Sequence, residues 1–243
     1  MKNHEKLIIA AGGKVISNRF IESAGIMITQ TSKTTQDFLE LSEKMNLDDE
    51  RPEYEVHGEL NSRITYMSFH SEKKSSKEFN HKMVNEFKHL SIYNDHHISI
   101  LLAGISVETS QEIVAHNEAT VSRLTSSKTL AQSNPLFVLN KSDINNQMKY
   151  INEIIDIRKK YIIDDKESDN MMFPCSKAVS IIATMSLKDW HKTLIGRLSK
   201  NGVEQELQDI MIKVCNLLNE KYPLVIKTAD EYYSMNNGAK YES

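Results

Sequence analysis

The sequence is poor in cysteine, with only Cys175 and Cys215. The two lie far apart and match no spacing of metal ligands, so we expect neither a disulfide framework nor a cysteine metal site, and a reducing compartment is indicated. Cys175 follows Pro174, but no base lies near it in the sequence, which favours a packed thiol over a nucleophile. The chemistry of this chain is therefore not expected to depend on cysteine.

Long apolar runs and an excess of positive charge are also missing. No segment approaches the roughly 20 apolar residues of a membrane helix, so we expect no membrane partner. The formal net charge is -3 and the pI is about 6.3, which provides no general basic surface for nucleic acid. Together with the cysteine content, these absences predict a soluble, cytoplasmic protein.

Familiar phosphate-binding and catalytic motifs are absent as well. The chain has no Walker loop, no G-x-G-x-x-G, no H-E-x-x-H and no G-x-S-x-G. His96 and His97 follow Asp95 and could bind a metal, but adjacent side chains on a strand point in different directions. A polar start of a strand is the favoured interpretation, and we expect no metal site.

The hydrophobic pattern predicts an α+β fold with a sheet-rich N-terminal half and a helical C-terminal half. Leu7–Gly13 could imitate a weak signal peptide, but a first strand is the favoured interpretation. We expect strands at Leu7–Ile16, Ile26–Thr29, Ile64–Phe69 and Ile98–Ile105. We expect a helix capped at Thr109 and two C-terminal helices, whose apolar faces are Leu187, Trp190, Leu194 and Leu198, and Leu207, Ile210, Met211, Val214 and Leu218.

The segment Ala115–Lys128 has an unusual composition. It contains one histidine, one arginine, one lysine and five hydroxyl side chains. Hydroxyls and backbone N–H groups suit phosphate oxygens, and Arg123 or Lys128 would compensate their charge. Composition alone favours the plainer alternative, a polar loop with helix-capping hydroxyls. The residues by themselves therefore indicate a candidate anion or nucleotide site and no particular reaction.

A motif gives this segment a more specific interpretation. It lies where flavin-dependent thymidylate synthases carry R-H-R-x-x-S-x-N-E-x-S-x-R, which it resembles with His116 identical and with Thr120 and Thr125 on the two serines. Further motifs follow the same order: Met67–Phe69 resembles V-S-F, 89–96 resembles H-x-T-P-F-E-H, 173–197 resembles L-P … L-R, 203–207 resembles A-Q-W-E-I, and 220–223 resembles E-K-x-P. The resemblance covers roughly residues 60 to 235.

The same motif also departs from the family pattern. Ala115 and Asn117 replace two arginines, Ser122 and Arg123 stand on the N-E pair, and Ser127 replaces the final arginine. Each lost guanidinium forfeits charge-assisted contacts with phosphate, typically about 1.5–3 kcal/mol. The site is therefore remodelled relative to the family.

The resemblance implies a single domain over residues 1–243, with a central antiparallel sheet and flanking helices. We expect residues 1–60 to form a divergent N-terminal part and about 236–243 a flexible tail. It implies a homotetramer that binds FAD and a pyrimidine nucleotide, with NADPH and methylenetetrahydrofolate as co-substrates. The family reaction is reductive methylation at C5 of dUMP. In that reading Arg197 and Thr125 act at the reaction centre, His116, Asn117, Thr120, Arg123 and His96 contact the flavin, and Glu112, Thr125, Ser126, Ser127 and Arg197 hold the nucleotide.

Three functional hypotheses remain open at this point. The first is flavin-dependent methyl or one-carbon transfer to a uridylate-like nucleotide in a specialised pathway. The second is a non-catalytic binding or scaffold protein that keeps the fold, because the arginines are missing. The third is a flavin enzyme with a non-nucleotide substrate, because Ala115 and Asn117 open space as well as removing charge. Arg197 also has a plainer interpretation, as a cation at the end of a helix.

Overall fold

A computed structural model describes residues 3–17, 19–44, 47, 50–67, 76–115, 119–123, 135–140, 142–160, 174–199 and 202–236. The chain divides into two compact units. The first comprises Met1–Thr29, Ser99–Thr184 and Val203–Ile210, and the second Gln30–Ile98, Met185–Gly202 and Met211–Ser243. Each unit combines segments from distant parts of the sequence. The expectation of a single domain stays a prediction.

The first unit contains a small sheet of β1 (Lys14–Ser17), β2 (Phe20–Ser23) and β6 (Phe137–Val138), in the order β1-β2-β6. β1 pairs with β2 antiparallel, and β2 with β6 parallel. The expected strand at Leu7–Ile16 is wrong in its first half, because α1 (Asn3–Ala10) is a helix. Gly12, with φ of 82°, follows that helix in the left-handed conformation that glycine adopts readily.

A second sheet has the strand order β3-β4-β7-β5. Its strands are β3 (Gly25–Thr31), β4 (His97–Ser106), β7 (Ala178–Ser186) and β5 (Thr120–Arg123). β5 runs antiparallel to β7, with Thr120 opposite Thr184. β3 and β4 confirm the expected strands at 26–29 and 98–105, whereas β7 was not expected in a C-terminal part interpreted as mostly helical. The α+β class is confirmed.

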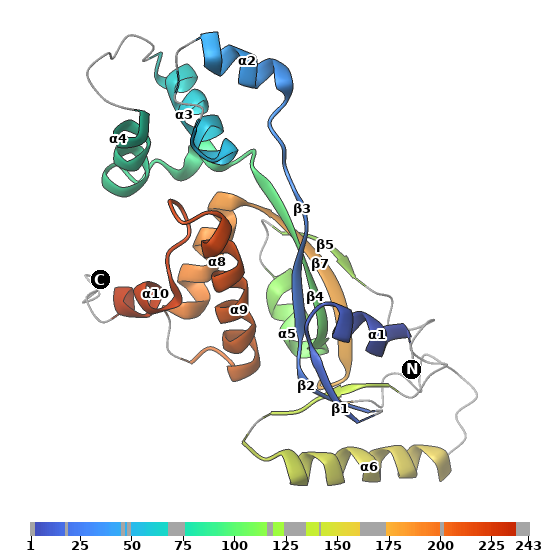
Figure 1. Cartoon of the computed structure of the whole chain (residues 1–243). Coiled ribbons are helices and arrows are strands. Elements are labelled where there is room, and N and C mark those ends of the chain that lie inside the picture. The colour runs from blue at the N-terminus through green and yellow to red at the C-terminus, as the bar shows by residue number, and fades with distance from the viewer. Residues whose placement is uncertain are drawn as a thin grey trace. The chain divides into compact units, whose positions relative to one another are not determined.

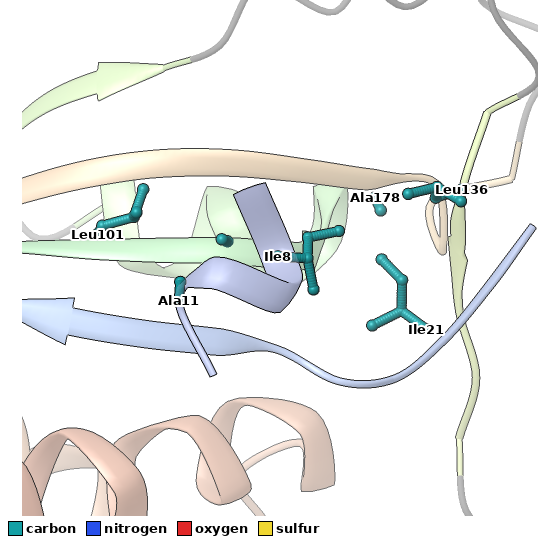
Figure 2. Close-up of a cluster of buried hydrophobic side chains, with 7 residues drawn as sticks. Ile8, Ala11, Ile21, Leu101, Leu136 and Ala178 are labelled. Atoms are coloured by element: carbon teal, nitrogen blue, oxygen red, sulfur yellow. The ribbon is translucent and has the colours of Figure 1, made fainter. Parts of the chain in front are cut away.

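Buried side chains from a helix and several strands form one core cluster of the first unit. Ile8 of α1, Ile21 of β2 and Leu101 of β4 pack with Leu136 and Ala178, and none is more than 8% exposed (Figure 2). A second cluster forms where α6 (Ile144–Lys160), drawn beside the small sheet in Figure 1, buries Ile151 and Ile155 against Phe20, Phe137 and Leu139. Burying each such side chain contributes about 1.5–3 kcal/mol.

The second unit is mainly helical. It contains α2 (Gln36–Lys44), α3 (Glu53–Tyr66), α4 (Ser76–His81), the π-helix η1 (Lys82–Glu86), the 3₁₀ helix η2 (Leu90–Tyr93), α8 (Leu187–Leu198) and α10 (Ala229–Asn236) (Figure 1). α9 (Gln205–Lys221) contributes residues to both units. The two predicted C-terminal apolar faces are confirmed, because every one of their nine residues is buried: Leu187, Trp190, Leu194, Leu198, Leu207, Ile210, Met211, Val214 and Leu218.

The strand expected at Ile64–Phe69 is wrong for the residues that the structure describes there. Ile64 and Tyr66 belong to α3 and are exposed. The buried face of this helix includes Glu59 and Arg63, an i,i+4 ion pair. Because charged residues occupy buried positions, the apolar residues of the segment do not follow the 3.6-residue period that identifies a helix. Within the described residues, no helix is long and apolar enough to cross a membrane.

Candidate functional site

In the first unit, the end of β4 leads into α5 (Val107–Val114), which carries Glu112. Ser106 caps this helix, since its hydroxyl accepts from the backbone N–H of Thr109 at 3.0 Å, so the cap lies three residues before the expected one at Thr109. The Glu206 carboxylate accepts from the backbone N–H of Ser106 at 2.8 Å. Glu112 is exposed on this helix, one position before the buried Ile113.

Carboxylates gather around α5. Burial raises the pKa of Glu204, and the negative charges of Glu206, Glu108 and Glu112 raise it further. Such a set repels a phosphate unless cations compensate it. Glu112 therefore suits contact with a sugar hydroxyl or a base more than contact with a phosphate.

Thr120 lies at the start of β5 with its side chain exposed. The backbone of Arg123 ends the same strand, opposite Ile181, while its side chain lies outside the part that the structure describes. His116, Asn117, Thr125, Ser126 and Ser127 also lie outside the described residues. Of the predicted site residues in the first unit, the structure therefore describes the side chains of Glu112 and Thr120.

The second unit contains the other two described candidates, Arg197 and His96. Arg197 is half-buried in the last turn of α8. His96 is 8% exposed, and its ring lies 5.3 Å from that of Tyr222 and 6.5 Å from that of His57. Burial lowers the pKa of His96 below its usual value. The structure thus keeps the His96 imidazole neutral at pH 7 within a cluster of rings.

A pocket of about 290 Å³ lies between the C-terminal half of α3 and the segment around η2. Six residues line it: Asn61, Thr65, Ser91, Ile92, Asn94 and Asp95. Its volume is just below the range of ligand-binding pockets, which span about 300–1,000 Å³. The pocket is therefore large enough for one ring system or a comparable part of a larger ligand.

Asp95 is held in this pocket by hydrogen bonds from α3. His57 Nε2 lies 2.9 Å from Asp95 Oδ2, and Asn61 Nδ2 donates to both carboxylate oxygens at 3.1 and 3.2 Å. His57 Nδ1 lies 3.2 Å from the hydroxyl of Thr34. The hydrogen bond from His57 is the main cause that lowers the pKa of Asp95 to about 2, despite opposition from partial burial. Asp95 is therefore a carboxylate at physiological pH.

Two aromatic residues lie next to pocket-lining residues in the sequence, one beside each wall. Tyr66 follows Thr65, and His89 precedes Ser91 by two residues. Their rings stack at 5.5 Å, and the hydroxyl of Tyr66 lies 2.9 Å from His89 Nδ1. The predicted motif 89–96 thus forms one wall of the pocket.

Sequence reasoning missed the other wall, which α3 provides. His57 and Asn61 are four residues apart and so share a helix face. That spacing could have identified them, but no element was expected over residues 57–61, which precede the strand expected at Ile64–Phe69. In the part of the chain described, no group of three histidine, cysteine or acidic side chains is arranged to hold a metal ion. Cys175 is exposed and Cys215 buried, and both are free thiols.

Comparison with protein families identifies one match over much of the chain. The model of the family described as "Thymidylate synthase complementing protein" matches residues 46–224. That range includes the pocket residues, Glu112, Thr120 and Arg197. A search of curated proteins returned no match.

Solved structures share the fold at low sequence identity. One is the flavin-dependent thymidylate synthase ThyX from Helicobacter pylori complexed with FAD and dUMP, with a TM-score of 0.62, 15% identity and coverage of 83% of this chain and 97% of that one. A second structure of ThyX from the same organism, also with FAD and dUMP, has a TM-score of 0.62 and 16% identity, covering 86% and 98%. The UMP/dUMP methylase PolB from Streptomyces cacaoi, bound with 5-Br UMP, has a TM-score of 0.63 and 8% identity, covering 90% and 97%.

Proposed function

The chain belongs to the thymidylate synthase complementing protein family, and from this premise we propose that it methylates C5 of a uridylate-like pyrimidine nucleotide with the help of bound FAD. The family match over residues 46–224 carries the proposal. Support comes from the shared fold of proteins whose structures contain FAD with dUMP, or 5-Br UMP. Bound flavin would supply the reducing equivalents, while the protein positions the substrate and provides charge.

Arg197 is the described residue best suited to hold the nucleotide. Its guanidinium is fixed in charge and can form two parallel hydrogen bonds with a phosphate or a pyrimidine edge. It is half-buried at the end of a helix whose buried face is anchored by Trp190 and Leu194. Contact between a half-buried guanidinium and an anionic ligand is stronger than at a fully exposed position. We propose Thr125, Ser126, Ser127 and Glu112 as further nucleotide contacts.

The described residues fit part of a flavin. The pocket beside Asp95 accommodates a ring system, and Ser91, Thr65 and Asn94 bring neutral hydrogen-bonding groups to it. Thr120, in the first unit, has an exposed hydroxyl on β5. We propose that Thr120 and His96, with His116, Asn117 and Arg123, belong to the flavin-binding region. Because His96 is buried, its role would be to shape that region.

The remaining parts of the proposal concern co-substrates and assembly. NADPH would reduce the flavin, and methylenetetrahydrofolate would donate the carbon. We propose a homotetramer in the cytoplasm, which analytical ultracentrifugation of the purified protein and fractionation of cells would test. An absorbance spectrum before and after incubation with FAD and gel filtration tests the cofactor. Retained flavin bands support the proposal, and a colourless protein contradicts its flavin part.

We expect the substitution Arg197→Ala to weaken nucleotide binding by about 10- to 150-fold, because a charge-assisted contact contributes about 1.5–3 kcal/mol. The measurement is titration of FAD-loaded protein with dUMP and with UMP, followed by an assay for the methylated nucleotide. FAD uptake should remain as in the unmodified protein.

Lys192→Ala is the matched control for this experiment. It removes a cation from the same helix, at a side chain that is 55% exposed and paired with Asp189. Exposed pairs of this kind contribute at most about 1 kcal/mol, so nucleotide affinity should not change. If the Arg197→Ala protein binds dUMP and UMP with affinities within twofold of those of the original protein, Arg197 does not contact the nucleotide.

The second candidate function is non-catalytic binding, which the departures at Ala115, Asn117 and Ser127 favour. It predicts an assembled protein with little affinity for FAD and a biological role that survives Arg197→Ala. Complementation of a gene deletion by the Arg197→Ala form would decide between the two. If the Arg197→Ala form restores the biological role, the result supports the binding-protein hypothesis. If it does not, the result supports the enzyme hypothesis.

A further inference from the structure

Three side chains of the second unit form a hydrogen-bonded relay that the proposed function does not use. Thr34 lies between β3 and α2, His57 lies on α3, and Asp95 follows η2. The hydroxyl of Thr34 lies 3.2 Å from His57 Nδ1, and His57 Nε2 lies 2.9 Å from Asp95 Oδ2. A hydroxyl, an imidazole and a carboxylate joined in this order are the groups of a nucleophilic triad, which is recognised by geometry and not by position in the sequence.

The charge of Asp95 fixes the direction in which the relay donates. Asp95 is ionised at neutral pH and only accepts hydrogen bonds, so Nε2 of His57 carries the proton of the bond between them. Nδ1 of the neutral imidazole is then an acceptor, and the hydroxyl of Thr34 donates to it. The two ring nitrogens exchange the roles that they have in serine proteases. The proton nevertheless moves the same way, from the hydroxyl to the imidazole.

Both ends of the relay are held in place. The carboxylate of Asp95 also accepts from Nδ2 of Asn61 and from its own backbone N–H. At the other end, the backbone N–H of Thr34 donates to Oε1 of Glu53 at 2.5 Å. Groups that are fixed before a reaction need little reorganisation during it.

The surroundings of Thr34 suit a small acyl group. Thr34 is half-buried and His57 is 17% exposed, so a small molecule can reach the relay from solvent. The ring of Phe38 lies 5.1 Å from that of His57 and packs against it, which disfavours a bulky ligand. α2 begins two residues after Thr34. The N–H groups in the first turn of a helix have no partner within it, and such groups stabilise a developing negative charge.

We propose that Thr34 is the nucleophile of an acyl-transfer site for small activated esters, with His57 as its base and Asp95 as a positioning residue. The oxygen of Thr34 forms a bond to the carbonyl carbon of the ester, and its proton passes to Nδ1 of His57. The bond between that carbon and the leaving oxygen then breaks, and the proton moves to the leaving group. Water, activated in the same way by His57, hydrolyses the acyl-threonine and restores the hydroxyl. The sequence of steps needs no co-reactant besides water, and it goes beyond the proposed function without depending on it.

The test uses the full-length protein, without FAD or nucleotide, and p-nitrophenyl acetate as the ester. We expect release of p-nitrophenolate above the rate in buffer, and an acetyl group that peptide mapping after acid quenching assigns to Thr34. Thr34→Val keeps the shape of the side chain and removes its hydroxyl, so the rate should fall at least about tenfold. Thr29→Val is the matched control and should leave the rate unchanged, because the hydroxyl of Thr29 donates to a backbone carbonyl, that of Ser99.

Two further variants separate the roles of His57 and Asp95. His57→Gln removes the base and should lower the rate about as far as Thr34→Val. Asp95→Asn introduces an amide that can donate to Nε2, which places the ring proton on Nδ1 and prevents that nitrogen from accepting. The maximal rate should then fall at least about tenfold while the ester concentration at half-maximal rate stays the same. The melting temperature of each variant is measured first, and if Asp95→Asn unfolds the protein, Thr34→Val still decides.

Three results would overturn the inference: a rate in the unmodified protein no higher than in buffer, an unchanged rate in a folded Thr34→Val protein, or acetyl groups found only on lysine. Failure of the proposed function is a separate outcome. It is read from the assay for the methylated nucleotide, in which p-nitrophenyl acetate takes no part.

Discussion

Replacing Glu59 with glutamine should destabilise the protein by about 3–5 kcal/mol, because it removes one partner of a buried ion network. Glu59 has no exposed surface, and its Oε2 accepts from Arg51 at 2.6 Å. Its Oε1 accepts from Nε and Nη2 of Arg63 at 2.7 and 2.6 Å. A neutral amide in that position leaves two buried guanidinium groups without the carboxylate between them. The free energy of unfolding in urea measures the effect, with the single Trp190 as fluorescent reporter.

The control for this substitution is Glu40→Gln on α2, whose side chain is exposed. It makes the same change in net charge, and surface changes of this kind stay within about 0.5 kcal/mol. If both variants unfold at the same urea concentration as the original, the network contributes nothing to stability. The expected large loss would also affect function, because Glu59 lies on α3 between His57 and Asn61, the two residues that hold Asp95.

Replacing Trp190 with alanine should also cost about 3–5 kcal/mol, the range for removing a large aromatic side chain from a core. Trp190 is fully buried on α8, and its indole N–H donates to the backbone carbonyl of Ile98 at 3.0 Å. Trp190→Phe should cost less, since phenylalanine retains part of the packing but leaves that carbonyl without its donor, a loss of about 1–3 kcal/mol. Thermal unfolding followed by circular dichroism gives the order of stabilities.

Tyr150→Ala provides the comparison for Trp190, since it removes an aromatic side chain that is 59% exposed on α6. Its melting temperature should stay close to that of the original protein. Equal losses for Trp190→Ala and Trp190→Phe would mean that the hydrogen bond to Ile98, and not packing, dominates the contribution of Trp190. A small loss for both would contradict the role of Trp190 as the anchor of α8.

The elements predicted correctly from the sequence are those whose apolar residues follow a simple period. β4 is a continuous apolar strand, and α8 and α9 bury one residue in every three or four. The elements that were mistaken lack such a signal. α3 buries charged residues, α1 is a short apolar run that periodicity cannot assign, and the apolar residues of β7 precede a helix without a turn signal between them.

The candidate site divides in the same way. The motif 89–96 was identified from the sequence and does form a wall of the pocket, and Glu112, Thr120, His96 and Arg197 lie in the segments that the family model matches. The roles of these four residues stay predictions, as do those of the candidates outside the described residues. His57 was not identified at all, because its partner Asp95 lies 38 residues further along the chain.

The sequence by itself determined the α+β class, the two C-terminal helices and membership of the thymidylate synthase complementing protein family. These depend on local periodicity and on the order of short motifs, which a chain carries whether or not it is folded. Only the tertiary structure decided that Glu59 is buried between two arginines and that Asp95 is a carboxylate held by α3. Burial and hydrogen bonding arise from residues distant in sequence, and they determine the protonation of an acidic group and the ligand atoms that it can accept.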